Sequence, residues 1–413
     1  MKHYLPYWCF YLHQGMITAL VMQGIAGYFR HAGLDLAQLS WLSLSFLPWI
    51  AKFLWAPFGE RHAIGLRGNP YLGSLVLLQL AMALMLVLTG MISPEGSLVA
   101  IILMLMLLVM LSASHDIYAD GITICTTTAS GRPLANMAQV GGSYLGILFG
   151  SFAFLSITEW AGWRSGFIAL ALLSLLMLIP PLCFTRPAPR LADTDAKRPA
   201  LNWLTVKTLW PVLVFTAIFY LAMRGMMALQ TVMLIDQKLS LSQLGLIMTI
   251  YSTFVSMAGI MLATHLIHRF GALRCLLPVM VTHALLAIVL ATGYAWWSLI
   301  AWIVLFGVVN LAAAVGFVTL YNVLMGLVRP HQPASDYALF QSTDAAVAMT
   351  VSLAALQFAY HTSYHTTLAV LAGIAVICLW PARRLGRRIF ADYHEGVDNH
   401  KECAENRLDP GRN

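Results

Sequence analysis

The chain has 413 residues, of which 60% are hydrophobic and only 10% are charged, and its mean hydropathy is +0.76. A water-soluble domain could not cover so much apolar surface, so the composition excludes that class of protein. The formal net charge of +7 is not gathered in a basic soluble module, which argues against nucleic-acid binding. The chain is therefore expected to lie in a lipid bilayer.

Apolar segments recur along the whole chain, each about 20 residues long and thus able to cross the hydrocarbon core as a helix. Residues 1–29 carry no small-residue cleavage site, so we expect them to form a first span rather than a removed signal. The segments predict twelve membrane-spanning helices, at residues 5–29, 39–59, 71–92, 97–118, 136–157, 164–183, 208–234, 242–265, 273–292, 296–323, 338–358 and 366–382.

Nearly all Lys and Arg residues fall in every second connection between these segments. If the amino terminus is cytoplasmic, 19 of the 24 basic residues lie on the cytoplasmic side, three lie outside (Arg30, Arg164 and Lys238), and two lie within spans (Lys52 and Arg224). Basic residues stay preferentially on the cytoplasmic side of a membrane. The pattern therefore predicts that both termini are cytoplasmic.

The two halves of the chain resemble each other. FYLHQGM (10–16) is echoed by FYLAMRGM (219–226), and LDLAQL (34–39) by LSLSQL (239–244). Parallel six-helix repeats are the construction of major-facilitator transporters. The sequence thus predicts an all-α membrane protein with that fold. Its expected parts are a six-helix bundle at 1–184, a Pro-rich and charged cytoplasmic linker at 185–206, a second six-helix bundle at 207–383, and a cytoplasmic tail at 384–413 that ends in disorder.

Short basic connections with glycine follow the second span of each half, ERHAIGLRG (60–68) and HRFGALR (268–274). In the major-facilitator superfamily, a loop of this kind latches the cytoplasmic ends of the helices. The resemblance implies that Glu60 and Arg61 form such a latch. A charge cluster that only sets the topology is the alternative.

Four stretches carry a more specific resemblance to the branch of muropeptide permeases and acetyl-CoA transporters. They are LSFLPWIAKFLWAPFGERH (44–62), SASHDIYADG (112–121), in which His115 replaces the usual Gln, GRPLANMAQVGGSYLGILFG (131–150) and SDYALFQS (335–342). A compact twelve-span chain is similar to the siderophore permeases of this branch, of the rhizobactin and pyochelin type, because the muropeptide permeases usually carry two further spans.

The resemblance implies a secondary transporter of the bacterial inner membrane. It would import a siderophore, ferric or iron-free, into the cytoplasm by proton symport with alternating access. Iron would enter only as part of the substrate, no cofactor would be needed, and an outer-membrane receptor could act upstream. A permease for muropeptides or another organic solute is the alternative.

Charges inside membrane spans are costly, so each is a candidate functional residue. Asp116 and Asp120 are four residues apart on one helix face, where two carboxylates compete for a proton. Lys52 with Asp116, and Arg224 with Asp344, are hypothetical ion pairs. For the two acids, an inner-gate salt bridge and a solvated helix end are the alternatives to proton coupling. The residues assigned to proton coupling or gating are Lys52, Glu60, Arg61, Asp116, Asp120 and Asp344.

Arg224 is also the main candidate for substrate contact, because its planar fork matches carboxylates and phenolates. His13 and Gln14 lie beside the repeat-equivalent of Arg224 in the first span. For His13, a hydrogen bond to a neighbouring helix is the alternative. The residues assigned to substrate binding are His13, Gln14, Tyr220, Arg224 and Gln341.

Enzymatic and metal-binding functions have weak signals. His115 and Asp120 spell the H-x4-D pattern of acyltransferases, but no phosphate-binding motif accompanies it, so a membrane-embedded acyltransferase is a remote alternative. No P-loop is present. The six cysteines are scattered singly, and the pair His361 and His365 has no acidic or Cys companion, so we expect no metal site.

Overall fold

The computed structural model describes residues 2–31, 41–94, 96, 98–188, 203–237, 246–247, 250–329 and 332–408. These residues form helices and their connections, with one isolated bridge between Leu66 and Asn69. Within this described part, nine helices are long and apolar enough to cross a membrane: Leu72–Met91, Leu98–Thr126, Ala129–Ala161, Trp163–Phe184, Leu209–Leu234, Ala272–Thr292, Leu299–Leu327, Pro333–His361 and Tyr364–Arg387. They correspond to nine of the twelve predicted spans.

The predicted second span, 39–59, is not one continuous helix. It consists of a 3-10 turn at Trp41–Phe46, α4 (Leu47–Ala51), a 3-10 turn at Lys52–Leu54, and α5 (Ala56–Arg61). Pro48 and Pro57 lie in the first turns of α4 and α5. Because proline lacks the N–H that a helix interior needs, helices tend to restart at such positions. The break places Lys52 in a short turn instead of a long helix.

The first and eighth predicted spans are helical with π-helical turns. α1 (Leu5–Ala19) and α2 (Ile25–His31) are joined by a π turn at Leu20–Gly24. In the eighth span, a π turn at Tyr251–Val255 precedes α14 (Ser256–Phe270), and residues 242–245 lie outside the described part.

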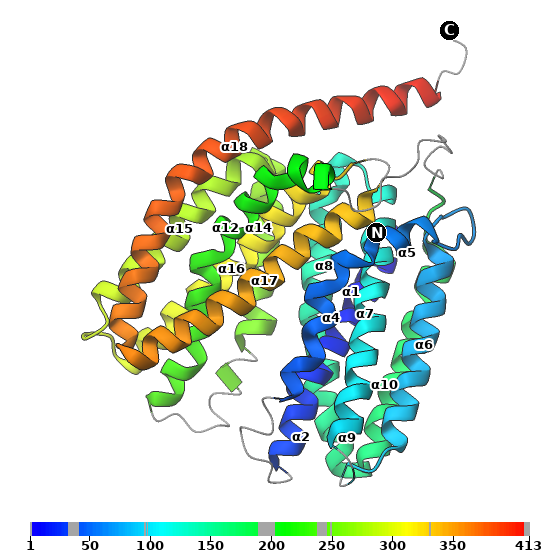
Figure 1. Cartoon of the computed structure of the whole chain (residues 1–413), viewed down its shortest axis with the longest axis horizontal. Coiled ribbons are helices and arrows are strands. Elements are labelled where there is room, and N and C mark those ends of the chain that lie inside the picture. The colour runs from blue at the N-terminus through cyan, green and yellow to red at the C-terminus, as the bar shows by residue number, and fades with distance from the viewer. Residues whose placement is uncertain are drawn as a thin grey trace. The chain divides into compact units, whose positions relative to one another are not determined.

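Residues Met1–Thr127, Leu134–Leu201 and Arg329–Ser342 form one compact unit, which we call unit 1. Its helices, after α1 to α5, are α6 (Leu72–Met91), α7 (Leu98–Thr126), α8 (Arg132–Ile147), α9 (Phe154–Ala161), α10 (Trp163–Met177) and α11 (Ile179–Phe184). α6 packs against both α7 and α10 (Figure 1). Buried apolar side chains such as Leu86, Leu105 and Phe167 fill the core between them.

Glycines let α1 approach α8 and the π turn that follows it, Leu148–Ala153. A Cβ added at Gly146 would lie 2.3 Å from the Leu12 carbonyl oxygen, and one at Gly150 would lie 2.0 Å from that of Met16. Only glycine fits at such backbone contacts, which are typical of packed membrane helices. The GGSYLGILFG stretch therefore fixes α1, which carries Tyr11 and His13.

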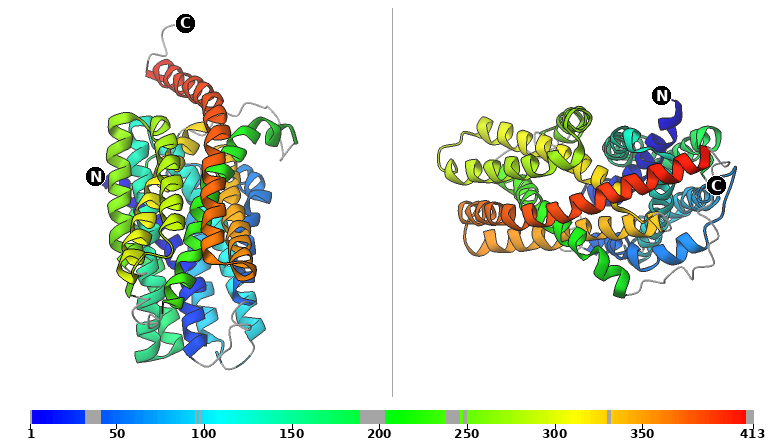
Figure 2. Two further views of the ribbon diagram at one scale, coloured as in Figure 1. Left: turned by 90° about the vertical axis from the view of Figure 1, so that its left-hand side faces the viewer. Right: turned by 90° about the horizontal axis from the view of Figure 1, so that it is seen from above.

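Unit 2 consists of Thr128–Pro133, Asn202–Val328 and Thr343–Asn413. Its helices are α12 (Trp203–Asp236), α14, α15 (Ala272–Thr292) and α16 (Leu299–Leu327), followed by most of α17 (Pro333–His361) and by α18 (Tyr364–Leu408). α18 packs along α12 and α15 and then continues beyond the other helices of the unit (Figure 2). α17 is shared, because its residues up to Ser342 belong to unit 1.

Two predicted extramembrane segments are only partly described. Residues 189–202 of the predicted linker lie outside the described part. The predicted tail is helical as far as Leu408, as the continuation of α18, and residues 409–413 are outside the described part. The orientation of the termini stays a prediction.

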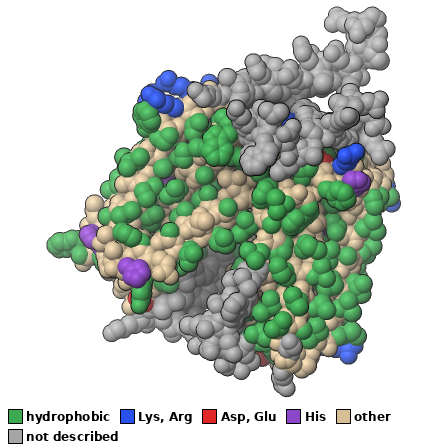
Figure 3. Space-filling model, in the orientation of Figure 1, with side chains coloured by type: hydrophobic (Ala, Val, Ile, Leu, Met, Phe, Trp, Pro, Cys, Tyr) green, Lys and Arg blue, Asp and Glu red, His purple; other side chains and the backbone are tan. Residues whose placement is uncertain are grey.

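The surface agrees with a lipid environment. On the face drawn in Figure 3, hydrophobic side chains cover the lengths of the helices, and the Lys and Arg side chains gather near helix ends. Exposed large side chains include Leu84, Leu103, Leu172 and Ile377. A soluble protein would not expose apolar side chains so continuously.

Candidate functional site

The first hypothetical ion pair is confirmed in unit 1. The Lys52 ammonium donates to Asp116 Oδ2 on α7 and to Gln341 Oε1 on α17, and it lies 4.7 Å from the centre of the Trp49 ring. The side chains of Lys52 and Asp116 are both fully buried. All three hydrogens of the ammonium can thus be accommodated by a carboxylate, an amide oxygen and an aromatic face.

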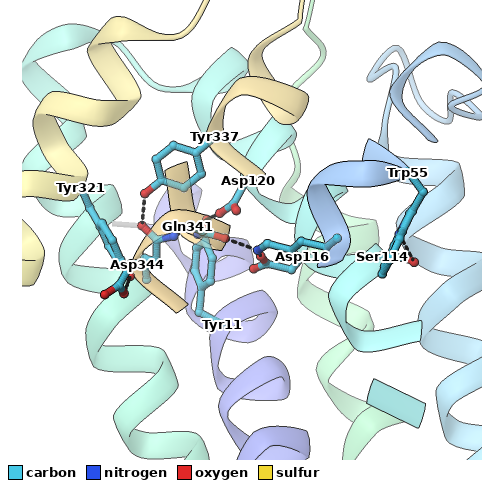
Figure 4. Close-up of polar contacts among 11 residues, drawn as sticks. Tyr11, Trp55, Ser114, Asp116, Asp120, Tyr321, Tyr337, Gln341 and Asp344 are labelled. Carbon is cyan, nitrogen blue, oxygen red and sulfur yellow. Dashed lines mark hydrogen bonds and ion pairs between the residues drawn. The ribbon is translucent and has the colours of Figure 1, made fainter. Parts of the chain in front are cut away.

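Asp120, one turn further along α7, is a second buried acid, 1% exposed. Its Oδ1 accepts hydrogen bonds from the Tyr11 hydroxyl (2.7 Å) and the Gln139 amide (3.1 Å), as Figure 4 shows for Tyr11 and Asp120. Asp116 Oδ1 and Asp120 Oδ2 are buried and accept no hydrogen bond from any described donor. The cluster therefore holds two acids and one bonded cation. The alternative of a solvated helix end is wrong, because α7 continues to Thr126 and buries both acids.

Glu60 caps the amino terminus of α17, although the two lie far apart in the sequence. Its Oε1 accepts from the Tyr71 hydroxyl (2.8 Å) and the Ala334 N–H (3.1 Å), and its Oε2 accepts from the Ser335 N–H (2.9 Å) and hydroxyl. Burial raises the pKa of the Glu60 carboxyl, and the hydrogen bonds from Ser335 and Tyr71 act in the opposite direction. A carboxylate is also favoured by the positive end of a helix. Arg61, in contrast, is exposed and has no bonded partner among the described residues.

We expect Glu60→Ala to destabilise the protein by about 3 kcal/mol, because it leaves buried donors of Tyr71, Ala334 and Ser335 without an acceptor. Thermal unfolding of the purified protein in detergent, followed by tryptophan fluorescence, measures the effect. Glu159→Ala, which removes an exposed acid, is the matched control and should leave the transition unchanged. Equal transitions for the two variants would contradict a capping role.

The first turns of α17 are bonded to other elements of unit 1 at three positions. Ser335 bonds to Glu60, Tyr337 donates to Gln139 Oε1 (3.0 Å), and Gln341 accepts from Lys52. Tyr337 and Gln341 are four residues apart and share one helix face, whereas Ser335 is bonded at the amino terminus of the helix. Because Gln139 also donates to Asp120, the second buried acid is linked to α17 through a single amide.

His13 and Gln14 were predicted to contact substrate, but His13 lies in the core of unit 1. Its Nε2 is 2.8 Å from Ser174 Oγ on α10, and its ring centre is 5.3 Å from that of His115. His115 in turn bonds to Gln79 Oε1 on α6 (3.3 Å). These contacts match the alternative of hydrogen bonding to neighbouring helices. Gln14 is half-buried, and its Oε1 accepts no hydrogen bond from a described donor.

The second hypothetical ion pair is confirmed in unit 2. Arg224 on α12 donates from Nε to Asp344 Oδ1 (3.0 Å) and from Nη2 to Asp344 Oδ2 (2.6 Å). Tyr321 on α16 lies 3.4 Å from the same Oδ2 (Figure 4). Tyr220, one turn before Arg224, is buried and presents its ring 5.5 Å from the guanidinium carbon.

Three residues of the unit 1 cluster were missed by the sequence analysis: Tyr11, Gln139 and Tyr337. Neutral polar side chains are common in membrane helices, so nothing but their position marks them. All three fall within stretches quoted for the repeat or the family resemblance, and that resemblance was the signal that could have found them. Among the described residues, no group of three His, Cys, Asp or Glu is placed to hold a metal ion.

No family model matches the sequence. The chain is 24% identical over 273 residues to the anhydromuropeptide permease of Escherichia coli K12, a match that covers 64% of this chain and 55% of that permease. A Rickettsia conorii protein named as a transporter, AmpG 4, is 21% identical over 372 residues, which cover 82% of this chain and 86% of that protein. The chain thus spans about half the length of the first curated relatives it matches.

The fold is that of known transporters. The crystal structure of the major-facilitator transporter FucP, in the outward conformation, superposes with a TM-score of 0.69 at 14% identity, covering 92% of this chain and 97% of that one. These similar proteins are transporters and not enzymes, so the acyltransferase alternative for His115 has no support. These comparisons also give no support to the predicted siderophore substrate or to an outer-membrane receptor. The chain therefore has the all-helical major-facilitator fold, and its sequence relatives favour the muropeptide alternative over the siderophore interpretation.

Proposed function

We propose that this chain is a proton-coupled secondary transporter that carries an anhydromuropeptide, or a closely related organic solute, across the bacterial inner membrane. Support for the solute comes from the name of the Escherichia coli relative. Support for proton coupling comes from the buried acids of unit 1. The energy source would be the proton gradient, with no cofactor on the chain.

The observation that carries the coupling is the imbalance of charge around Lys52. Asp116 and Asp120 lie one turn apart on α7, and Lys52 is bonded to Asp116, whereas Asp120 accepts only from the neutral donors Tyr11 and Gln139 among the described residues. Two buried carboxylates with one cation leave an uncompensated negative charge, which is costly in a membrane interior. Binding one proton removes that charge, so the cluster is suited to exist in a protonated and a deprotonated form.

The same cluster is hydrogen-bonded to α17, so protonation of its acids could change how α17 is held. Asp120 reaches Tyr337 through Gln139, and Asp116 reaches Gln341 through Lys52. A proton on Asp120 would weaken the hydrogen bond that its Oδ1 accepts from Gln139. We propose that the hold on the first turns of α17 is stronger in one protonation state, so that proton binding biases alternating access.

Uptake by proteoliposomes containing the purified chain tests the proposal. Radiolabelled anhydromuropeptide should accumulate when the outside is acidic, and a protonophore should abolish the accumulation. A ferric siderophore in a parallel assay tests the interpretation drawn from the sequence. Protonophore-sensitive uptake of the siderophore, without uptake of the muropeptide, would overturn the proposed substrate.

A further inference from the structure

The Arg224–Asp344 ion pair is more exposed to solvent than the Lys52–Asp116 ion pair. The side chain of Arg224 is 22% exposed, whereas Lys52 and Asp116 are 0% exposed. A guanidinium carries five N–H groups, and the only acceptor bonded to them among the described residues is Asp344, which uses two. Arg224 is thus a partly accessible cation whose fork is occupied by a carboxylate of its own chain.

Aromatic rings line this cation. The guanidinium carbon lies 4.7 Å from the centre of the Phe317 ring and 5.5 Å from that of Tyr220. The two rings are 5.4 Å apart and tilted by 36°. Such rings hold a guanidinium in a fixed plane and also present apolar faces to whatever binds it.

We infer that Arg224 binds a carboxylate group of the transported solute, and that Asp344 occupies this position when the solute is absent. The inference rests on the proposed function, because it names the chemical class of the solute. The internal pair is a direct precedent, since a carboxylate already binds the fork through two parallel hydrogen bonds. A cation within a membrane span needs an anion, so a solute carboxylate replaces Asp344.

Replacement of Asp344 by the solute carboxylate couples solute binding to the uptake of a proton. When the solute takes the two N–H donors, the Asp344 carboxylate loses its cation and binds a proton from water to become a neutral carboxylic acid. The charge at the site is unchanged, since one anion and one proton arrive together. On release of the solute, Asp344 returns its proton to water and reoccupies the fork.

The other titratable groups around the pair are few. Tyr321 lies 3.4 Å from Asp344 Oδ2, and Tyr220 packs on the guanidinium. His283 on α15 is one ring further away, with its ring centre 6.5 Å from that of Phe219. Among the described residues of α12 and α14 to α18, no other titratable side chain bonds to Arg224 or Asp344. Asp344 is therefore the group whose protonation follows exchange.

Binding and proton uptake by the full chain in lipid nanodiscs test the inference. The probes are an anhydromuropeptide and benzoate, each compared with its neutral form, the carboxyl-amidated muropeptide and benzamide. Tryptophan fluorescence reports binding, and a pH-indicator dye in weak buffer counts protons. We expect the wild type to prefer the carboxylates and to take up about one proton per probe bound, which makes its affinity fall as pH rises.

Variants separate the two roles. Arg224→Gln should weaken binding of the carboxylate probes by about thirtyfold or more, the usual result of truncating one partner of a buried charge pair. Asp344→Asn should bind them without proton uptake and without pH dependence. Arg224→Lys keeps the charge but loses the fork, so it should fold and still bind more weakly. Glu159→Gln, which neutralises an exposed acid outside the site, is the matched control and should resemble the wild type.

The outcomes test the carboxylate site at Arg224 separately from the proposed muropeptide substrate. Arg224-dependent binding of benzoate without binding of the muropeptide supports the carboxylate site and overturns the substrate. Binding that is unchanged in Arg224→Lys, or a proton uptake unchanged in Asp344→Asn, overturns the inference. Failure of both carboxylates to bind the wild type overturns it as well.

Discussion

Substitution of Lys52 by methionine is expected to destabilise the protein by about 3–5 kcal/mol, because it leaves the fully buried Asp116 without its cation. The ammonium is also the hydrogen-bond donor to Gln341 Oε1. Methionine has a similar length and fits an apolar environment, so the loss measures electrostatics and hydrogen bonding rather than a cavity. The cation removed is 0% exposed, and hence unscreened by solvent.

The double variant Lys52→Met/Asp116→Leu provides the decisive comparison. If the single variant is unstable because of an unpaired carboxylate, removing that carboxylate should restore much of the lost stability. Thermal unfolding in detergent, followed by tryptophan fluorescence, measures all members of the cycle. Arg61→Gln removes an exposed cation nine residues away in the sequence and should have no effect.

Additive losses in this cycle would contradict the ion pair as the source of stability. A stable Lys52→Met variant would do so too, and it would mean that Asp116 already carries a proton. Rescue of stability without rescue of transport is the result we expect. It would separate the contribution of the pair to the fold from its contribution to coupling.

The charged core could be predicted from sequence because a buried charge is costly whatever the fold. Lys52, Asp116, Arg224 and Asp344 stand out in apolar segments, and a charge in such a place must find a partner of opposite sign. The two ion pairs that the sequence suggested, Lys52 with Asp116 and Arg224 with Asp344, are both present. The same rule does not apply to neutral amides and hydroxyls, which is why Gln139 and Tyr337 were missed.

The backbone of the second span could not be predicted because hydropathy takes no account of where a helix is interrupted. Residues 39–59 are apolar enough to span, but Pro48 and Pro57 restart the helix on either side of Lys52. The cap that Glu60 provides for α17 was also beyond the sequence, since its partners are 274 and 275 residues away. The family resemblance predicted that Glu60 forms a latch, but it did not predict that the partner of Glu60 is the amino terminus of α17.

Asp120→Asn is expected to abolish the proton that the unit 1 cluster contributes to transport. The substitution should be tolerated structurally, because the Asn oxygen can still accept from Tyr11 and Gln139 as Oδ1 does now. The amide cannot bind a proton at neutral pH, so the cluster would lose its protonated and deprotonated forms. Each coupled proton can support at most about tenfold accumulation per unit of pH gradient.

Two assays on the same proteoliposomes separate coupling from transport. Exchange of internal unlabelled solute for external labelled anhydromuropeptide needs no gradient and should proceed near the wild-type rate. Accumulation driven by one unit of pH gradient should fall by about tenfold, the share of one proton. Glu159→Gln, which neutralises an exposed acid, should match the wild type in both assays.

The pattern of results shows whether Asp120 carries one of the coupled protons. Retained exchange with reduced accumulation places the coupling proton on Asp120. Loss of both activities in a stably folded variant would instead make Asp120 part of the helix movement itself, through Gln139 and Tyr337. Unchanged accumulation would exclude Asp120 as a proton carrier and leave Asp344, whose carboxylate must change partner whenever Arg224 does, as the next candidate.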